Sequence, residues 1–216
     1  ASAFALGSNV FLSTDSGYSE LLESKMVSAL DIALQKQGYT QTASVKSPYI
    51  YAEENFSDDL ELAYAAFAQT QYKEIKKTHP GSYLHFLPGA LADALQMSLV
   101  EKVTPWLGTD TARHYQWYPF INLGHYELAK QLKGKQRDTV TGYYRKGIEL
   151  VSEKARQNAF YRGIPFIWCS NNLTTSFAIQ CYWYQQLTGD KTYEALMQAN
   201  IDWLFGCNPW GTSMVY

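Results

Sequence analysis

The sequence predicts an all-α protein built from antiparallel helical hairpins. Apolar residues recur at helical spacing along almost all of its 216 residues, as between Tyr193 and Leu204, where only Asn200 interrupts the stripe. Turn residues, and not the alternating patterns of strands, separate these stripes. The order helix, short turn, helix and long aromatic loop recurs along the chain. This recurrence favours paired helices that can close into a toroid with their loops at one mouth, or else a single bundle.

The apolar stripes place eight helices in order along the chain. They are expected at residues 2–12, 19–36, 58–70, 89–103, 120–132, 137–160, 172–187 and 191–205.

Local signals explain two of the helix ends. Gly189 follows a helix and Asp190 is placed to cap the next one, which predicts a short hairpin, and Gly206 ends the last helix in the same way. Three longer connections, at residues 38–57, 104–118 and 161–171, combine Pro or Gly with several aromatic residues. Such loops on a helical scaffold commonly carry binding residues.

Composition and charge exclude several classes of function. With 46% hydrophobic residues and no linker rich in Pro, Gly or Ser, residues 1–216 are expected to form a single domain. Eighteen basic against 20 acidic residues give a net charge of -2, which lacks the basic field that nucleic acid requires. No stretch approaches the ~20 apolar residues that span a bilayer. We therefore expect neither nucleic-acid nor membrane partners.

The cysteines indicate no functional site, whereas the aromatic residues suit a ligand. Cys169, Cys181 and Cys207 are widely spaced, with no C-x-x-C pair, so we expect buried, reduced thiols and neither a metal site nor a cofactor. The aromatic content is high, at 15%, with 17 Tyr and 6 Trp. Aromatic rings near solvent suit flat ligands such as sugars, although a core would also take many of them.

An acidic cluster precedes the third predicted helix. Asp58, Asp59 and Glu61 lie where the first helical turn is expected, so they can meet the positive end of the helix dipole, with Ser57 as the N-cap. The functional alternative is that adjacent carboxylates bind a hard cation or orient a sugar hydroxyl. Asp58 and Asp59 are therefore candidate site-supporting acids.

Two Trp-containing loops that enter helices are candidates for sugar binding. Trp117 and Tyr118 precede the helix that contains His125, and a Trp there can stack on a pyranose ring or wedge between helices. His125 itself is expected to be a core or surface residue. In the second loop, Trp168 can stack beside hydroxyl contacts from Ser170 and Asn171, although capping alone also explains those two side chains.

The C-terminal segment is expected to make a rigid turn. Gly206 stops the last helix, and the Asn208-Pro209 pair that follows can aim the next stretch of chain into a cleft. No G-x-S-x-G elbow, P-loop, H-E-x-x-H or dinucleotide glycine pattern occurs, which removes the common nucleophile, phosphate, zinc and dinucleotide interpretations.

Four segments, in this order and spacing, resemble glycoside hydrolase family 9, which includes many endoglucanases. Residues 55–63 are similar to the family's S-Y-x-D-D-x-E-x-A segment, and residues 117–128 are similar to W-x-x-x-x-x-L-G-x-Y-x-L-A. Residues 168–171 are similar to W-G-S-N, with Cys169 in place of Gly. Residues 204–215 are similar to the first twelve positions of L-L-G-x-N-P-x-G-x-S-x-V-T-G. The resemblance spans nearly the whole chain.

The resemblance implies part of an (α/α)6 barrel that cleaves a β-linked glucan with inversion and belongs to a secreted or periplasmic protein. The family's D-A-G-D base motif, its P-H-H-R segment and its acid Glu are not found in the sequence. The catalytic acid and base are therefore expected outside a chain that is a segment of a longer catalytic domain, inactive when isolated. We expect glucan contacts from five residues: Trp117, Tyr118, Trp168, Ser170 and Asn171.

Two alternatives remain open at the level of sequence. A non-catalytic helical glycan-binding protein would lack an acid and base pair by nature, and its aromatic content would be the same. A helical repeat scaffold for protein partners is the weaker alternative, because it would seldom need so many Trp and Tyr residues in its loops.

Overall fold

The computed structural model describes residues 1–37, 56–70, 89–101, 123–167 and 170–215. Within these ranges the regular secondary structure is eight α-helices and no strand, which confirms the predicted all-α class. The chain divides into two compact units, Ala1–Glu101 and Lys102–Tyr216. None of the helices in the described ranges is long and apolar enough to cross a membrane.

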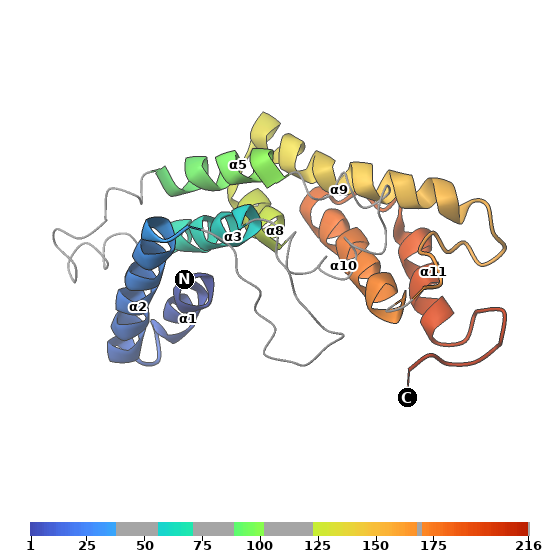
Figure 1. Cartoon of the computed structure of the whole chain (residues 1–216), viewed down its shortest axis with the longest axis horizontal. Coiled ribbons are helices and arrows are strands. Elements are labelled where there is room, and N and C mark those ends of the chain that lie inside the picture. The colour runs from blue at the N-terminus through green and yellow to red at the C-terminus, as the bar shows by residue number, and fades with distance from the viewer. Residues whose placement is uncertain (38–55, 71–88, 102–122, 168–169, 216) are drawn as a thin grey trace. The chain divides into compact units, whose positions relative to one another are not determined.

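The first unit contains α1 (Ser2–Phe11), α2 (Ser16–Gln35), α3 (Ser57–Ala68) and α5 (Ala90–Glu101). A short connection joins α1 to α2, and the two pack as a hairpin (Figure 1). Helix α1 also packs on α3, and α3 packs on α5. The buried apolar side chains at these contacts include Ala5, Leu22, Met26, Val27, Leu30, Leu60, Ala63, Tyr64, Phe67 and Ala94.

The second unit contains α8 (Leu123–Gln131), α9 (Gly134–Ala155), α10 (Ser170–Thr188) and α11 (Glu194–Leu204). Helix α10 packs against α8, α9 and α11, so it forms the centre of this unit (Figure 1). Short connections join α8 to α9 and α10 to α11, as hairpins require. The core includes Leu128, Val140, Tyr144, Ile148, Val151, Leu173, Phe177, Cys181, Leu196, Trp203 and Leu204.

At two of the helix ends that differ from the sequence prediction, one polar side chain decides where the helix begins or ends. Helix α2 begins at Ser16 and not at residue 19, because the Asp15 carboxylate caps it by accepting a hydrogen bond from the Tyr18 N–H at 2.9 Å. Helix α9 ends at Ala155 and not at residue 160, because Asn158 folds the chain back. Its Oδ1 accepts hydrogen bonds from the N–H groups of Phe160 and Arg162 at 3.1 and 3.2 Å.

The hairpin between α10 and α11 has the predicted Gly and a different role for Asp190. Gly189 lies in the left-handed region at φ 74°, and its N–H donates to the Gln185 carbonyl at 2.8 Å. Helix α11 has Tyr193 at its N-cap position with no side-chain cap, so the predicted capping by Asp190 is wrong. The Asp190 carboxylate instead accepts hydrogen bonds from the Thr192 N–H and the Tyr184 hydroxyl, both at 2.9 Å.

Candidate functional site

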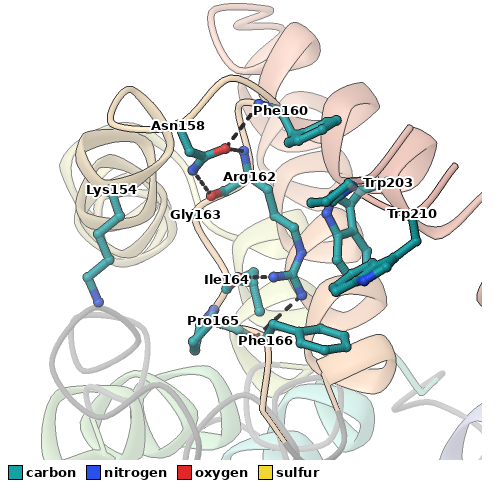
Figure 2. Close-up of a pocket in the computed structure, with 11 residues that line it drawn as sticks. Lys154, Asn158, Phe160, Arg162, Gly163, Ile164, Pro165, Phe166, Trp203 and Trp210 are labelled. Carbon is teal, nitrogen blue, oxygen red and sulfur yellow. Dashed lines mark hydrogen bonds between the residues drawn. The ribbon is translucent and has the colours of Figure 1, made fainter. Parts of the chain in front are cut away.

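A pocket of about 450 Å³ lies at one end of the second unit, where α9 and α11 end and α10 begins. Figure 2 shows its lining, which comes from the last turn of α9, the loop before α10, the last turn of α11 and the loop after it. The lining residues are Lys154, Asn158, Phe160, Arg162, Gly163, Ile164, Pro165, Phe166, Trp203, Pro209 and Trp210. They combine aromatic rings with two cations and contain no carboxylate.

Arg162 is a buried cation, only 7% exposed, at the centre of this pocket. Its guanidinium donates to the carbonyls of Ile164 and Pro165 and, at 3.0 Å, to the Thr174 hydroxyl near the start of α10. It also lies 3.9 Å from the centroid of the Trp203 ring. No carboxylate of the described ranges pairs with it, and burial lowers the pKa of Arg162 to about 10, so it stays protonated at neutral pH.

Three aromatic rings gather beside Arg162 (Figure 2). Trp203 is 3% exposed, whereas Phe166 and Trp210 are 59% and 54% exposed. The centroids of Phe166 and Trp210 are 4.8 Å apart, and both rings contact Trp203, at 5.5 and 6.1 Å. One buried ring therefore supports two rings that are open to solvent.

Asn208 holds the loop that carries Trp210. The buried Asn208 amide donates to the carbonyls of Trp203 and Thr212 at 2.9 and 2.7 Å, and its oxygen accepts from the Trp210 N–H at 3.1 Å. Gly206, at φ 118°, supplies the left-handed residue that ends α11. The Asn208-Pro209 turn therefore places Trp210 at the pocket.

The residues that the sequence predicts for glucan contact have different outcomes. Trp117, Tyr118 and Trp168 lie outside the described residues. Ser170 and Asn171 begin α10 next to the pocket. Ser170 is buried, and the Asn171 amide donates to the Met214 carbonyl at 3.1 Å, which ties the start of α10 to the loop after α11. Their contact with sugar stays a prediction.

The structure adds residues that the sequence analysis did not single out. Arg162 and Phe166 lie in the loop before α10, and Trp203 and Trp210 lie at the end of α11 and in the loop after it. The packing of α10 against α11 brings these two segments together. Phe166 lies in one of the predicted aromatic loops, and Trp210 directly follows the predicted Asn208-Pro209 turn.

The acidic cluster belongs to the first unit. Asp58 and Asp59 lie in the first turn of α3, as the structural interpretation predicts, but Phe56 and not Ser57 occupies the N-cap position, because the helix already begins at Ser57. No group of three or more His, Cys, Asp or Glu side chains in the described ranges is arranged to hold a metal ion. Buried His125 contacts the rings of Tyr143 and Tyr144, at 5.5 and 6.1 Å.

Asp59 is expected to make stability depend on pH. The side chain lies at the surface, yet the protein atoms around it desolvate the carboxylate and raise its pKa. Because the folded state holds this proton more tightly than the unfolded chain, the contribution of Asp59 to stability falls as pH rises from the unfolded pKa through the folded one. Asp59→Asn should therefore raise the midpoint of thermal unfolding at pH 7 and lose this advantage at pH 3.

The control for this measurement is Asp138→Asn, an exposed position on α9. It should change the free energy of unfolding by no more than about 0.5 kcal/mol at either pH. A lower midpoint for Asp59→Asn at pH 7 would show that attraction to the α3 dipole outweighs the desolvation of the carboxylate.

The cysteines follow the prediction in part. Cys181 is a buried free thiol on α10, and burial raises its pKa. Cys207 is an exposed free thiol, contrary to the prediction, because it lies in the loop beyond Gly206 and not on the buried face of α11. Cys169 lies outside the described residues.

The structure therefore combines helical hairpins with an aromatic pocket at the ends of α9 and α11, which is the type of helical protein to compare with known families. The family model of glycosyl hydrolase family 9 matches residues 1–216, so the chain belongs to this family and its helices are part of an (α/α)6 barrel. Membership of this family indicates glycoside hydrolase chemistry and a carbohydrate substrate. No curated protein and no solved structure was found to match the chain.

Proposed function

We propose that the protein carrying this chain hydrolyses a β-linked glucan of the cellulose type with inversion of the anomeric carbon. The observation that carries the proposal is the family match over residues 1–216, and the aromatic pocket of the second unit supports it. Inversion needs an acid that protonates the leaving oxygen and a base that activates water, with the two carboxyl groups ~6.5–9.5 Å apart.

Within this proposal the chain supplies barrel helices and glucan-binding loops, and the acid and base come from outside its 216 residues. This division rests on the family resemblance, because the D-A-G-D base motif and the acid Glu of the family are not found in the sequence. The substrate contacts are those predicted at Trp117, Tyr118, Trp168, Ser170 and Asn171. We further propose that the 216 residues belong to a single domain and are a segment of a longer catalytic domain. We also propose that the protein is secreted or periplasmic, where its polysaccharide substrate is found.

Two assays test the proposal. The complete protein should release reducing sugar from soluble β-glucan, and proton NMR of the fresh product should show the α-anomer. The 216-residue chain alone should release none, because loss of a general acid or base typically costs about 10²–10⁴-fold in rate.

Three results would contradict the proposal. A β-anomeric product would exclude inversion. Reducing-sugar release by the isolated chain, abolished by Asp58→Asn or Asp59→Asn, would place the site in the acidic cluster of α3. Binding without hydrolysis by the complete protein would favour a non-catalytic glycan-binding protein.

A further inference from the structure

We propose that Phe166 and Trp210 form a platform that binds one ring of a neutral glucan chain through the ring's C–H face. The inference rests on the proposed function and adds two binding residues to those that the sequence predicts. Both rings are more than half exposed, although they are among the largest apolar groups in the chain. Their centroids are 4.8 Å apart with the planes tilted by 41°, so the two rings pack against each other, and both line the pocket.

The platform is held in place before any ligand arrives. Buried Trp203 supports both rings from beneath, with an edge-to-face contact to Trp210, and the Arg162 guanidinium packs on Trp203. The amide of Asn208 fixes the backbone of Trp210. Because these contacts already hold the rings, a ligand has little side-chain entropy to offset on binding.

The charge of the lining selects among sugar polymers. Lys154 and Arg162 are the charged residues of the pocket, and no Asp or Glu lines it. A protonated amino sugar would therefore approach the Arg162 cation, which no carboxylate of the described ranges neutralises, whereas the hydroxyl groups of glucose carry no such penalty. The pocket therefore favours a β-glucan over a polymer of glucosamine with the same linkage.

The test is isothermal titration of the full chain with cellohexaose and with the β-1,4-linked glucosamine hexamer. Trp210→Ala and Phe166→Ala should each weaken cellohexaose binding by about tenfold, and Trp210→Phe should keep most of the affinity. The matched control is Phe205→Ala, which removes a ring that is 66% exposed in the same unit but outside the pocket, and it should leave the affinity unchanged. The glucosamine hexamer should bind the wild-type chain at least several-fold more weakly than cellohexaose.

Each other outcome overturns a stated part of the inference. Wild-type affinity in both alanine variants, an equal loss in Phe205→Ala, or no binding of cellohexaose to the wild-type chain would exclude the platform. If Trp210→Ala lowers the midpoint of thermal unfolding, the cellohexaose affinity of Phe166→Ala decides whether the platform binds the glucan. Equal affinity for the two hexamers would exclude the charge argument alone.

Different results would contradict the platform and the proposed function. β-Glucan hydrolysis by the complete protein, together with unchanged binding in the alanine variants, would exclude the platform only. Loss of cellohexaose binding in Trp210→Ala, together with no β-glucan hydrolysis by the complete protein, would contradict the proposed function and support the platform.

Discussion

Replacing Arg162 with methionine is expected to lower the free energy of unfolding by about 3 kcal/mol, although the change removes a buried charge. Methionine keeps much of the side-chain volume but donates no hydrogen bond. The carbonyl of Ile164 and the hydroxyl of Thr174 would each lose a donor in a buried place, and the partly buried carbonyl of Pro165 would lose a longer contact.

Two opposing terms decide the sign of this effect. Burial lowers the pKa of Arg162 from 12.5 to about 10, which corresponds to a cost of about 3 kcal/mol for holding the charge inside the protein. Hydrogen bonds from a charged donor contribute about 1.5–3 kcal/mol each, and a desolvated cation on a Trp ring contributes about 2 kcal/mol. The bonds and the ring contact therefore outweigh the cost of burial.

Urea unfolding of the full chain measures the effect. Arg145→Met on α9 is the matched control, because its side chain is well exposed, and it should stay within about 0.5 kcal/mol of the wild-type chain. The free energy of unfolding of Arg162→Lys should lie between those of Arg162→Met and Arg145→Met, since lysine keeps the charge but not the planar fork of donors. A methionine variant as stable as the wild-type chain would show that relief of the buried charge compensates for every lost contact.

The helices could be predicted from the sequence because the spacing of apolar residues is a local property. The helical stripes are found in the structure, and the errors lie at their ends. There a single side chain, such as Asp15 before α2 or Asn158 after α9, outweighs the periodic pattern. The assignment of Asp190 as a cap failed for a related reason, since the sequence alone does not show that Tyr184 and Thr192 bind its carboxylate instead.

The pocket could be predicted only in part. Its aromatic loops are visible in the sequence, and the Asn208-Pro209 pair correctly indicated a fixed turn after α11. The position of Arg162 could not be inferred, because it depends on Thr174 and Trp203, which reach it through the packing of α10 on α11. Nothing in the residues next to Arg162 distinguishes it from an exposed arginine.

Gly163 lies directly against Val151 of α9, and Gly163→Ala is the second substitution with a large expected effect. An added Cβ would lie 2.2 Å from the carbonyl oxygen of Val151 and 2.4 Å from its Cγ1. A backbone oxygen cannot move aside as a flexible side chain can, so the loop must shift away from α9. Overpacking of this kind typically costs about 1–3 kcal/mol, and contact with backbone places the expected value at about 3 kcal/mol.

Gly142→Ala is the control, and it should change the free energy of unfolding in the opposite direction. Gly142 lies inside α9, where an added Cβ meets no atom within 4 Å, so alanine there should stabilise the chain by about 0.5–1 kcal/mol through its higher helix propensity. Thermal or urea unfolding of both variants measures the difference. Because Gly163 lies between Arg162 and Ile164, its variant should also displace the Ile164 carbonyl from the guanidinium and weaken cellohexaose binding. Equal stability of the two variants would show that the loop can move away from Val151 at little cost, and that the pocket is less rigid than its hydrogen bonds indicate.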